Sequence, residues 1–393
     1  MEPSKAEKRI RVILVFDNLE FSGAEKVGIN LLRNADRFRL VDLSGVICMD
    51  DRLGCARVSP NLHHLTAHWR RDGGLLRRLI RAISAIFKLR SASLGADILI
   101  PVTPPAALIS KLAAFGRPIL VIPWVHFDFR GTQRDVWPPD HRFRGWIQRV
   151  LYLKIIPKFK RIIFVSEGCL KSFPIPRNRD RMWVALPNVF VPESFVTSVN
   201  SRTAAKIGEL KMQGRPILAF IGRIFRQKRW EDSIKVAELL RNRGFDFHMV
   251  FIGDGIEQKQ FLASIDTSPA RDVIHYLGTD ENVQPALEMT DGLILTSLFE
   301  AWPTVILEAF SAMVPVFAYD CPSGPREMLG NGSRGQLTDE SPAALATAII
   351  EYFDAHPQDR RTRLADARRF IEQFSPTNAI PIWESKLREL AVV

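Results

Sequence analysis

This sequence lacks paired cysteines, long apolar runs and repeats, and each absence argues against a class of protein. Its four cysteines form no CxxC pair and no zinc-type spacing, which argues against a disulfide framework and against a structural metal site. The most apolar stretch, residues 98–124, is interrupted by five prolines, Lys111 and Arg117. It therefore lacks the run of about 20 lipid-compatible residues that a membrane-spanning helix needs. Tandem repeats and low-complexity tracts are also absent.

The N-terminus carries charges ahead of a short apolar run, as a signal peptide does. That run is only about six residues long and is soon followed by Asp17. The pattern favours a first β-strand over a signal peptide.

The chain length and composition indicate a two-domain globular protein. At 393 residues the chain is too long for one ordinary core and fits two domains of roughly 150 to 200 residues. The composition, 46% apolar and 25% charged, excludes disordered and fibrous classes.

Positive charge is concentrated in the first half of the chain. Residues 1–200 contain 32 Lys and Arg against 17 Asp and Glu, a net charge of +15, whereas residues 201–393 contain 22 against 26, a net charge of −4. An anionic partner for the first half is expected. Nucleic acid, an anionic membrane and a phosphorylated substrate all fit this charge.

Short apolar runs alternate with helical patterns twice along the chain. Runs of this kind are typical of strands buried on both faces, and their alternation with helices predicts parallel sheets. In the first half the runs span residues 11–17, 40–47, 96–102, 118–126 and 161–166. After a polar, proline-punctuated stretch beyond residue 187, the runs span residues 217–223, 246–255, 273–278, 291–297 and 314–320.

This organisation predicts two doubly wound α/β domains with a cleft between them. The predicted boundaries are residues 1–190 for an N-terminal domain and 191–375 for a second domain. A C-terminal helix, 376–393, is expected to pack back on the first domain. In open parallel sheets ligands bind beyond the carboxyl ends of the strands.

The stretch "SLFEAWPTVILEAF", residues 297–310, places two carboxylates after such a strand. Proline is tolerated best at the first position of a helix, so a helix is expected to begin near Pro303 or Thr304. The helix N-terminus favours an anion such as a diphosphate. Glu300 and Glu308 would then accept hydrogen bonds from sugar hydroxyls on either side of it, as a nucleotide sugar provides. The alternative is a capping carboxylate and a solvated helix glutamate.

A second motif, "FIGRIFRQKRWED" at residues 220–232, ends another strand with a glycine and a basic loop. Gly222 lets the backbone turn or approach a ligand. Arg223 and Lys228, with Arg226 and Arg229 beside them, suit a diphosphate. A solvated basic turn is the alternative.

Together these motifs resemble those of glycosyltransferase family 4, whose members have the two-Rossmann GT-B fold. "GRIFRQK" is similar to the family's G-R-x(4)-K element, "SLFEAWPTVILEA" to its E-x7-E motif, and "IGDG" and "FSGAEKVGINLLRN" to further family segments. The resemblance covers nearly the whole chain. It implies that residues 1–190 form an acceptor-binding, membrane-facing domain and residues 191–375 a nucleotide-sugar-binding domain. Asp254 of "IGDG" is also a candidate cap for the following helix.

The resemblance implies roles for individual residues. It assigns donor binding to Gly23, Arg223, Lys228, Thr304, Val305 and Glu308, and catalytic roles to His126 and Glu300. By this resemblance Arg223 and Lys228 neutralise the donor diphosphate. Glu308 would hold the ribose hydroxyls and Glu300 the transferred sugar.

The remaining assignments concern the edges of the expected site. Thr304 and Val305 would offer the helix N-terminus to phosphate, and Gly23 would form the facing loop of the first domain. His126 would lie across the cleft near the reacting sugar. A histidine after a strand is also commonly structural, and that alternative stays open.

Three positions depart from the family pattern. Ser22 and Ala301 each replace a usual glycine and add a Cβ near the expected sugar pocket, and Met313 stands where glycine is common. None of the three changes removes a charged group, so activity is expected.

The resemblance implies a retaining hexosyltransferase that needs no metal and no cofactor. The acceptor hydroxyl would attack on the front face while Arg223, Lys228 and the helix N-terminus stabilise the leaving diphosphate. No DxD sequence occurs in the chain, which fits metal independence. The donor is expected to be a UDP- or GDP-linked sugar.

Two basic segments of the first domain indicate a membrane partner. Residues 75–90 place Leu76, Leu79, Ile80, Ile83, Ile86 and Phe87 near one face, and residues 141–161 have a similar pattern with Trp146 and Tyr152. Such segments can lie on an anionic membrane. The expected acceptor is a lipid-linked glycan or a lipopolysaccharide or exopolysaccharide precursor, at the cytoplasmic face of the inner membrane. The alternative is that both apolar faces pack into the core.

Other functions remain open at this point. A sugar-nucleotide epimerase or a phosphorylase would share the fold, and a non-catalytic nucleotide- or glycan-binding protein would share the site. Nucleic-acid binding would use the basic surface but leaves Glu300 and Glu308 unexplained. The oligomeric state is not indicated.

Overall fold

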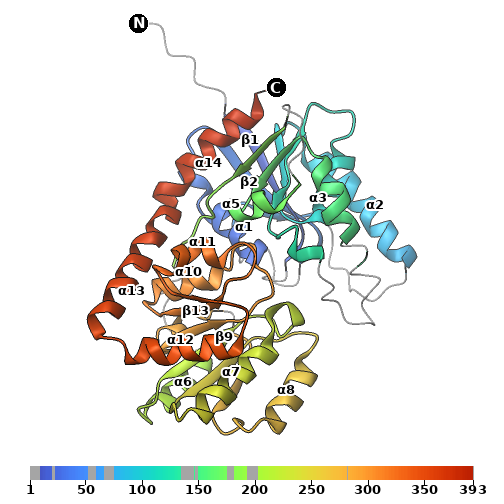
Figure 1. Cartoon of the computed structure of the whole chain (residues 1–393). Helices are drawn as coiled ribbons and strands as arrows, with labels where there is room; N and C mark the ends of the chain where they lie inside the picture. Colours follow the sequence, from blue (N-terminus) through green and yellow to red (C-terminus); the bar gives the residue numbers. More distant parts are fainter. Residues whose placement is uncertain are drawn as a thin grey trace, which may run out of the picture. The chain divides into compact units, whose positions relative to one another are not determined.

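The computed structural model describes residues 9–19, 23–51, 59–65, 75–133, 146, 149–174, 181–192, 202–280 and 282–392. These residues form two compact units (Figure 1). Unit 1 comprises the described residues up to Val191 together with those from Gln373 onward, and unit 2 comprises those from Pro192 to Glu372. The division of work into an acceptor domain and a donor domain stays a prediction.

Unit 1 is built on a five-stranded parallel sheet in the order β3-β2-β1-β4-β5. The strands are β1 (Ile10–Leu19), β2 (Val41–Asp51), β3 (Leu62–His64), β4 (Ile98–Pro101) and β5 (Leu120–Val121). Residues 12–16 of β1 are all apolar and buried, as expected of a strand covered on both faces. The helices that follow these strands are α1 (Gly23–Arg33), α2 (Leu75–Ala92) and α3 (Pro104–Ala113).

A second, three-stranded parallel sheet completes unit 1. It contains β6 (Trp124–Val125), β7 (Arg161–Phe164) and β8 (Met182–Ala185), with the short helix α5 (Glu167–Ser172) after β7. Ser166 caps α5 by accepting a hydrogen bond from the Cys169 N–H at 3.0 Å, which satisfies a donor that the first turn leaves unpaired.

The C-terminal helix α14 (Pro376–Ala391) also packs within unit 1. Trp383 lies against Trp124 with ring centroids 4.6 Å apart and donates its indole N–H to the Pro187 carbonyl at 2.7 Å. Glu384 accepts from the backbone N–H groups of Arg39 and Leu40.

The basic segment 141–161 is helical over most of its described part. Trp146, Arg149 and Val150 are α-helical, and a π-helical turn (Leu151–Ile155) and a 3-10 turn (Ile156–Lys158) follow them. Tyr152 packs edge-on against Phe127, and Ile156 and Phe159 are buried. The core-packing alternative therefore holds for these side chains, while Trp146 is exposed.

Unit 2 is a six-stranded parallel sheet in the order β11-β10-β9-β12-β13-β14. The strands are β9 (Ile217–Ile221), β10 (His248–Ile252), β11 (Ile274–Gly278), β12 (Gly292–Leu295), β13 (Val316–Tyr319) and β14 (Gln336–Thr338). Its helices are α6 (Arg202–Lys211), α7 (Trp230–Asn242), α8 (Gln258–Thr267), α9 (Gln284–Leu287), α10 (Thr304–Ser311), α11 (Pro325–Met328), α12 (Pro342–Asp354) and α13 (Pro357–Ile371).

Both larger sheets reverse their strand order at one point, so the predicted α/β class with two doubly wound, Rossmann-like units is confirmed. The reversal falls between β1 and β4 in unit 1 and between β9 and β12 in unit 2. Doubly wound sheets bind ligands at this switch point, beyond the carboxyl ends of the strands. In unit 2 the two loops that leave β9 and β12 carry the two charged motifs of the sequence.

Candidate functional site

The loop after β9 is held by close backbone packing against the loop after β10. The Gly222 N–H donates to the Ile252 carbonyl at 3.0 Å, and the Ile224 N–H donates to the Asp254 carbonyl at 2.6 Å. A Cβ on Gly253 would lie 1.9 Å from the Gly222 oxygen. A Cβ on Gly255 would lie 2.0 Å from the Ile224 oxygen. The glycines of "IGDG" therefore let this backbone approach the loop that carries Arg223.

The expectation that Asp254 caps the following helix is wrong. Helix α8 begins at Gln258 with Glu257 as its N-cap residue, and no side chain accepts a hydrogen bond there. The Asp254 backbone carbonyl instead fixes Ile224.

We expect Gly253→Ala to destabilise the protein by at least about 3 kcal/mol, because the new Cβ meets backbone that side-chain motion cannot clear. Gly253 also has φ +139°, which disfavours any other residue. The matched control is Gly214→Ala, at φ +74° with nothing within 4 Å of its added Cβ, expected to cost about 1 kcal/mol. Urea unfolding measures the stability of both variants. Equal midpoints for Gly253→Ala and Gly214→Ala would contradict this account.

The loops after β9 and β12 are joined to each other by hydrogen bonds. The Leu298 N–H donates to the Gln227 carbonyl at 2.8 Å, and the Gln227 side-chain amide donates to the Phe299 carbonyl at 2.8 Å. The buried Thr296 hydroxyl lies 2.9 Å from the carbonyl oxygens of Lys228 and Arg229. The two charged motifs thus form one connected structure.

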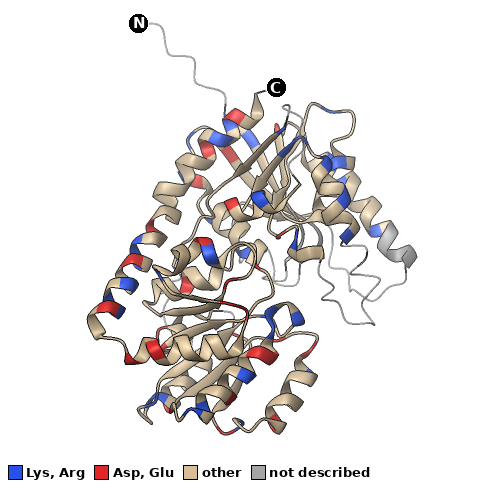
Figure 2. Ribbon diagram, in the orientation of Figure 1, with Lys and Arg blue, Asp and Glu red and all other residues tan. Residues whose placement is uncertain are grey.

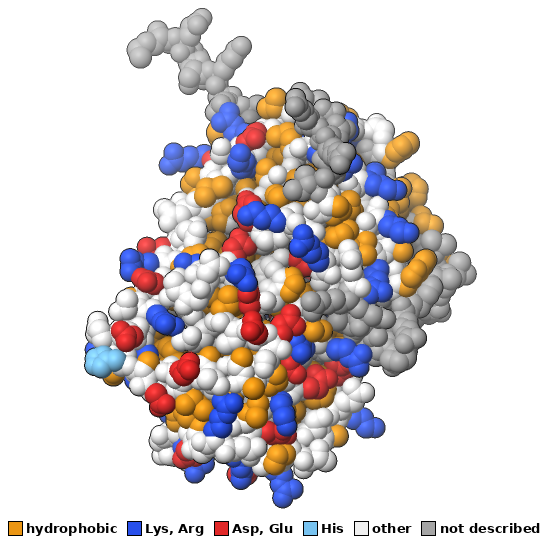
Figure 3. Space-filling view, in the orientation of Figure 1, with side chains coloured by type: hydrophobic (Ala, Val, Ile, Leu, Met, Phe, Trp, Pro, Cys, Tyr) orange, Lys and Arg blue, Asp and Glu red, His pale blue; other side chains and the backbone are white. Residues whose placement is uncertain are grey.

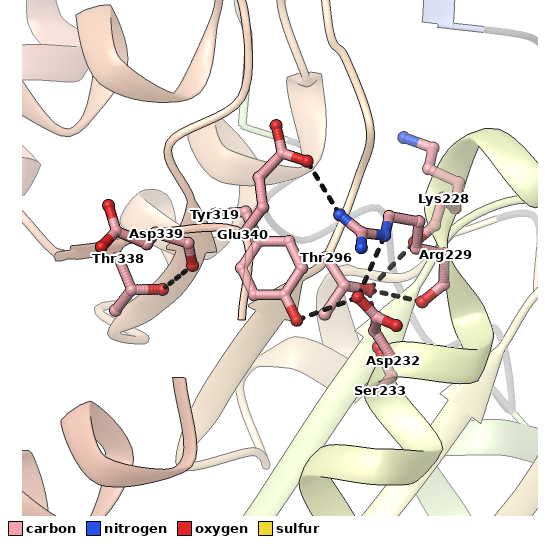
Figure 4. Close-up of polar contacts among 9 residues, drawn as sticks. All are labelled: Lys228, Arg229, Asp232, Ser233, Thr296, Tyr319, Thr338, Asp339 and Glu340. Carbon is pink, nitrogen blue, oxygen red and sulfur yellow. Dashed lines mark hydrogen bonds and ion pairs between the residues drawn. The ribbon is translucent and has the colours of Figure 1, made fainter. Parts of the chain in front are cut away.

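A network around Arg229 holds the same turn from its other side (Figure 4). Arg229 has a left-handed backbone, φ 47° and ψ 52°, which a non-glycine residue keeps only where its surroundings determine it. Its guanidinium pairs with Asp232 at 3.0 Å and with Glu340 at 2.9 Å. Its guanidinium carbon also lies 5.4 Å from the ring centroid of Tyr319. The turn before α7 is therefore held from both α7 and the loop after β14.

Tyr319 enters the network as a hydrogen-bond donor. Its hydroxyl donates to the Asp232 carboxylate at 3.1 Å. Burial, together with the neighbouring Asp232 charge, raises the pKa of Tyr319, so the hydroxyl stays protonated. Burial also raises the pKa of Asp232, and the Arg229 guanidinium opposes that shift.

Lys228 and Glu300 form a direct ion pair. The Lys228 Nζ lies 2.5 Å from Glu300 Oε1, with side-chain exposures of 19% and 8%. The Ser297 hydroxyl donates to the same carboxylate oxygen at 2.6 Å. The structure therefore brings these two predicted residues together, one from each motif, and leaves them mostly shielded from water.

Helix α10 begins where the sequence predicted, with Pro303 as its N-cap residue. Thr304 and Glu308 are half-buried and one turn apart on the same face, while Val305, Ile306 and Leu307 are buried. The backbone of Gly324 packs closely against the loop before the helix, because a Cβ added at Gly324 would lie 2.8 Å from Pro303 Cδ. The helix N-terminus and Glu308 thus belong to the same edge of unit 2 as Glu300.

No contact among the described residues gives Arg223 or Gly23 a structural role. Arg223 is exposed, and no hydrogen bond or ion pair holds its side chain in the described part of the chain. Gly23 begins α1 at the switch point of unit 1, and a Cβ added there meets nothing within 4 Å of the described residues. A role in ligand binding stays a prediction for both residues.

His126 follows β6 in unit 1 and packs on Trp124 with ring centroids 4.6 Å apart. Its Nε2 is buried without a hydrogen-bond partner among the described residues. Burial lowers the pKa of His126 to about 3, so its imidazole is neutral at physiological pH. Its position relative to a bound donor sugar stays a prediction.

The depressed pKa of His126 predicts loss of stability in acid. The unfolded chain binds a proton near pH 6.5 while the folded chain does not, so stability falls as the pH drops from 6.5 toward 3. Between pH 7 and pH 5 we expect wild type to lose about 1 to 2 kcal/mol more than His126→Gln. Urea unfolding at both pH values measures this difference. Equal losses in the two proteins would contradict a buried neutral imidazole.

Sequence reasoning missed several residues that shape these surroundings. Thr296 and Ser297 contact Lys228 and Glu300, and only their place directly after β12 signalled them. Asn188 is 2% exposed, and both polar atoms of its side chain lack hydrogen-bond partners among the described residues. Buried side-chain amides normally have hydrogen-bond partners. The structure gives no explanation for the buried amide of Asn188 in unit 1.

The departures from the family pattern have different consequences. Met313 follows α10 with φ 58°, at the position where glycine commonly ends a helix, so this change concerns helix termination. Ala301 is half-buried beside Gly324. Ser22 lies outside the described residues. Within the described ranges, no group of three His, Cys, Asp or Glu residues is placed to hold a metal ion.

Comparison with known proteins concerns the family of unit 2 and the fold of the chain. Residues 201–369, which contain the whole sheet of unit 2, match the family model for glycosyl transferases group 1. The crystal structure of Anabaena Alr3699/HepE in complex with UDP and glucose aligns with a TM-score of 0.74 at 17% identity, covering 97% of this chain and all of that one. The family match is to unit 2, and the structural likeness at 17% identity shows a shared fold.

Two curated relatives show how far the sequence similarity extends. An uncharacterised glycosyltransferase of Haemophilus influenzae is 21% identical over 292 residues, covering 74% of this chain and 76% of that protein. The lipopolysaccharide 1,6-galactosyltransferase of Salmonella typhimurium is 33% identical over 135 residues, or 33% of each chain.

Proposed function

We propose that this protein is a retaining hexosyltransferase of family 4 type that uses a nucleotide-diphosphate sugar. The observation that carries the proposal is the joined pair of loops at the switch point of unit 2. These loops present Arg223, Lys228 and Glu300 beside the N-terminus of α10. A cationic edge with a helix N-terminus suits a diphosphate, and the two glutamates suit the hydroxyls of its sugars.

In this proposal Arg223 contacts the donor diphosphate directly, and Thr304 and Val305 offer the backbone of the first turn of α10 to it. Glu308 accepts from the ribose hydroxyls. Glu300 reaches the transferred sugar from its ion pair with Lys228, so that one side chain neutralises phosphate while its partner orients the sugar. For unit 1, we propose a donor-binding role for Gly23 and a catalytic role for His126.

The leaving diphosphate is stabilised by protein charges in this mechanism. The acceptor hydroxyl attacks on the face from which the diphosphate leaves, which retains the anomeric configuration. His126 is neutral and would act as a hydrogen-bonding group toward the sugar.

The proposed reaction needs no metal ion. We expect transfer activity measured after EDTA treatment and gel filtration to equal that of untreated protein. Loss of activity that added Mg²⁺ or Mn²⁺ restores would contradict this expectation, because a metal would then share the diphosphate with Arg223 and Lys228.

The proposed acceptor is a lipid-linked glycan or a lipopolysaccharide or exopolysaccharide precursor. The lipopolysaccharide galactosyltransferase among the relatives supports this class, and so does the net charge of +15 on residues 1–200. No helix in the described ranges is long and apolar enough to cross a bilayer. We place the protein peripherally on the cytoplasmic face of the inner membrane.

The test is direct assay of transfer with UDP-hexoses and GDP-hexoses and a synthetic polyprenyl-diphosphate-linked sugar as acceptor. The expected product has the anomeric configuration of the donor, read by the proton coupling of its anomeric carbon. Conversion of the donor to another sugar nucleotide without acceptor would instead indicate an epimerase. Tight nucleotide binding with no turnover of any donor would indicate a non-catalytic binding protein.

A further inference from the structure

The outward faces of α2 and α3 carry large apolar side chains that are exposed in the described chain. On α2 these are Ile80, Ile83 and Phe87, at helical positions i, i+3 and i+7. On α3 and the turn after it they are Leu108, Leu112 and Phe115. Phe87 is 67% exposed and Phe115 80% exposed. We call these six residues the α2–α3 ridge.

The ridge is separate from the faces that these helices use for folding. Ala85 and Leu89 of α2, and Ala106, Ile109 and Ala113 of α3, are buried in one cluster with residues of β1, β2 and β4. Ile86 packs against this cluster while Ile80, Ile83 and Phe87 are exposed, so these four residues do not share the single face that the sequence indicated. None of the six ridge residues belongs to the cluster.

Hydrogen bonds hold the two helices in one arrangement. Arg90, one turn beyond Phe87, donates from Nη1 to the carbonyl oxygens of Ala113 at 2.9 Å and Phe115 at 2.7 Å. Arg117 in turn donates to the Arg90 carbonyl. The ends of both helices are thereby fixed to each other, with Phe87 and Phe115 at that end.

Positive charge surrounds the ridge. Neither helix contains an acidic residue, whereas Lys88 and Lys111 are exposed and Arg81, Arg90 and Arg117 lie in or beside the helices. Figure 2 shows only basic residues among the charged positions of α2 and α3. Figure 3 shows apolar and basic side chains next to each other over the part of unit 1 where these helices lie.

We propose that the α2–α3 ridge is the surface by which this protein docks on an anionic lipid bilayer. Exposed phenylalanine and leucine side chains enter the boundary between headgroups and acyl chains, while lysine and arginine keep their charged ends among anionic headgroups. A membrane fits better than a second protein chain because the apolar residues stand among long basic side chains with no acidic ones. The inference rests on the proposed function in expecting a lipid-linked acceptor and a peripheral membrane protein, and it names the surface that contacts the membrane.

The test is sedimentation of the full-length protein with phosphatidylcholine vesicles that contain or lack phosphatidylglycerol. Wild type is expected to sediment with the anionic vesicles only, and less as salt is added. The double variant Phe87→Ser with Phe115→Ser is expected to partition at least about tenfold more weakly. The matched control is Met212→Ser with Ile256→Ser, two exposed apolar residues of unit 2, which should sediment like wild type.

Several outcomes would overturn the inference. These are equal sedimentation of the ridge and control variants, equal binding to neutral and anionic vesicles, or no vesicle binding by wild type. Light scattering that shows a dimer dissociated by the ridge substitutions, without vesicle binding, would assign the ridge to a second copy of the chain. Should the double variant unfold, Lys88→Glu gives the same test through charge, with weaker sedimentation expected.

Vesicle binding and donor binding are separable in this experiment. Arg223→Ala is expected to sediment like wild type, because Arg223 lies in unit 2. Vesicle binding without nucleotide-sugar turnover would defeat the proposed function and leave the docking surface standing. Nucleotide-sugar turnover without vesicle binding would overturn the docking surface and leave the proposed transfer activity standing.

Discussion

Lys228→Met is expected to lower the kcat/KM for sugar transfer by about 10² to 10³-fold, as loss of a charge that stabilises a leaving group does. The same substitution is expected to destabilise the protein by about 3 kcal/mol, because it leaves the Glu300 carboxylate, 8% exposed, without its cation. Ser297 remains as a donor to Glu300, which places the effect at the lower end for a broken buried pair. Steady-state kinetics and urea unfolding measure the two effects.

The control is the double variant Lys228→Met with Glu300→Gln. Removing both charges is expected to restore most of the lost stability while activity stays low, because no buried charge is left unpaired. If the double variant is as unstable as Lys228→Met, Lys228 contributes to stability mainly by packing. Wild-type activity in Lys228→Met would exclude it from the donor site.

Arg223→Ala is expected to lower kcat/KM by about 10 to 100-fold, the effect of losing a hydrogen bond to a charged group. Its stability should stay within about 0.5 kcal/mol of wild type, because no hydrogen bond or ion pair of the described chain uses its exposed side chain. Arg223→Ala should lower kcat/KM without lowering stability, whereas Lys228→Met should lower both. Both are basic residues of one motif, yet only Lys228 is tied to Glu300.

Arg271→Ala provides the matched control, since Arg271 is also an exposed arginine of unit 2. It should leave both kinetics and unfolding unchanged. If Arg223→Ala behaves like this control, the basic turn is a solvated surface and the diphosphate must bind elsewhere.

Most strands could be predicted because a strand buried on both faces is a continuous apolar run. The strands β9, β10, β12 and β13 all lie within the predicted ranges. The short edge strands β3 and β14 were missed. Gln336–Thr338 is three residues long and half-buried throughout, so no apolar run marks it.

The prediction of one strand over residues 118–126 was wrong. The segment divides into β5 and β6, which belong to different sheets. Pro123 lies between them and has no N–H to donate, although its carbonyl still accepts from Ile163 at 2.9 Å. A periodicity argument does not register such a break, because the flanking residues are all apolar.

The candidate site could be located from sequence but its internal pairing could not. The positions of both motifs after strands predicted that they share one edge of the sheet. The ion pair between Lys228 and Glu300 joins residues that are 72 positions apart. Its formation depends on the turn before α7 and on the Thr296 hydrogen bonds, which no periodic pattern encodes.

The central claim, a nucleotide-sugar site at the switch point of unit 2, is tested most directly by thermal unfolding with UDP, GDP and ADP. One of these nucleotides, at about 100 times its Kd, should stabilise wild type by roughly 2.7 kcal/mol. It should stabilise Glu308→Gln much less, because in the proposed site Glu308 accepts hydrogen bonds from the ribose hydroxyls. A shift of equal size in both proteins, or no shift with any nucleotide, would contradict the account.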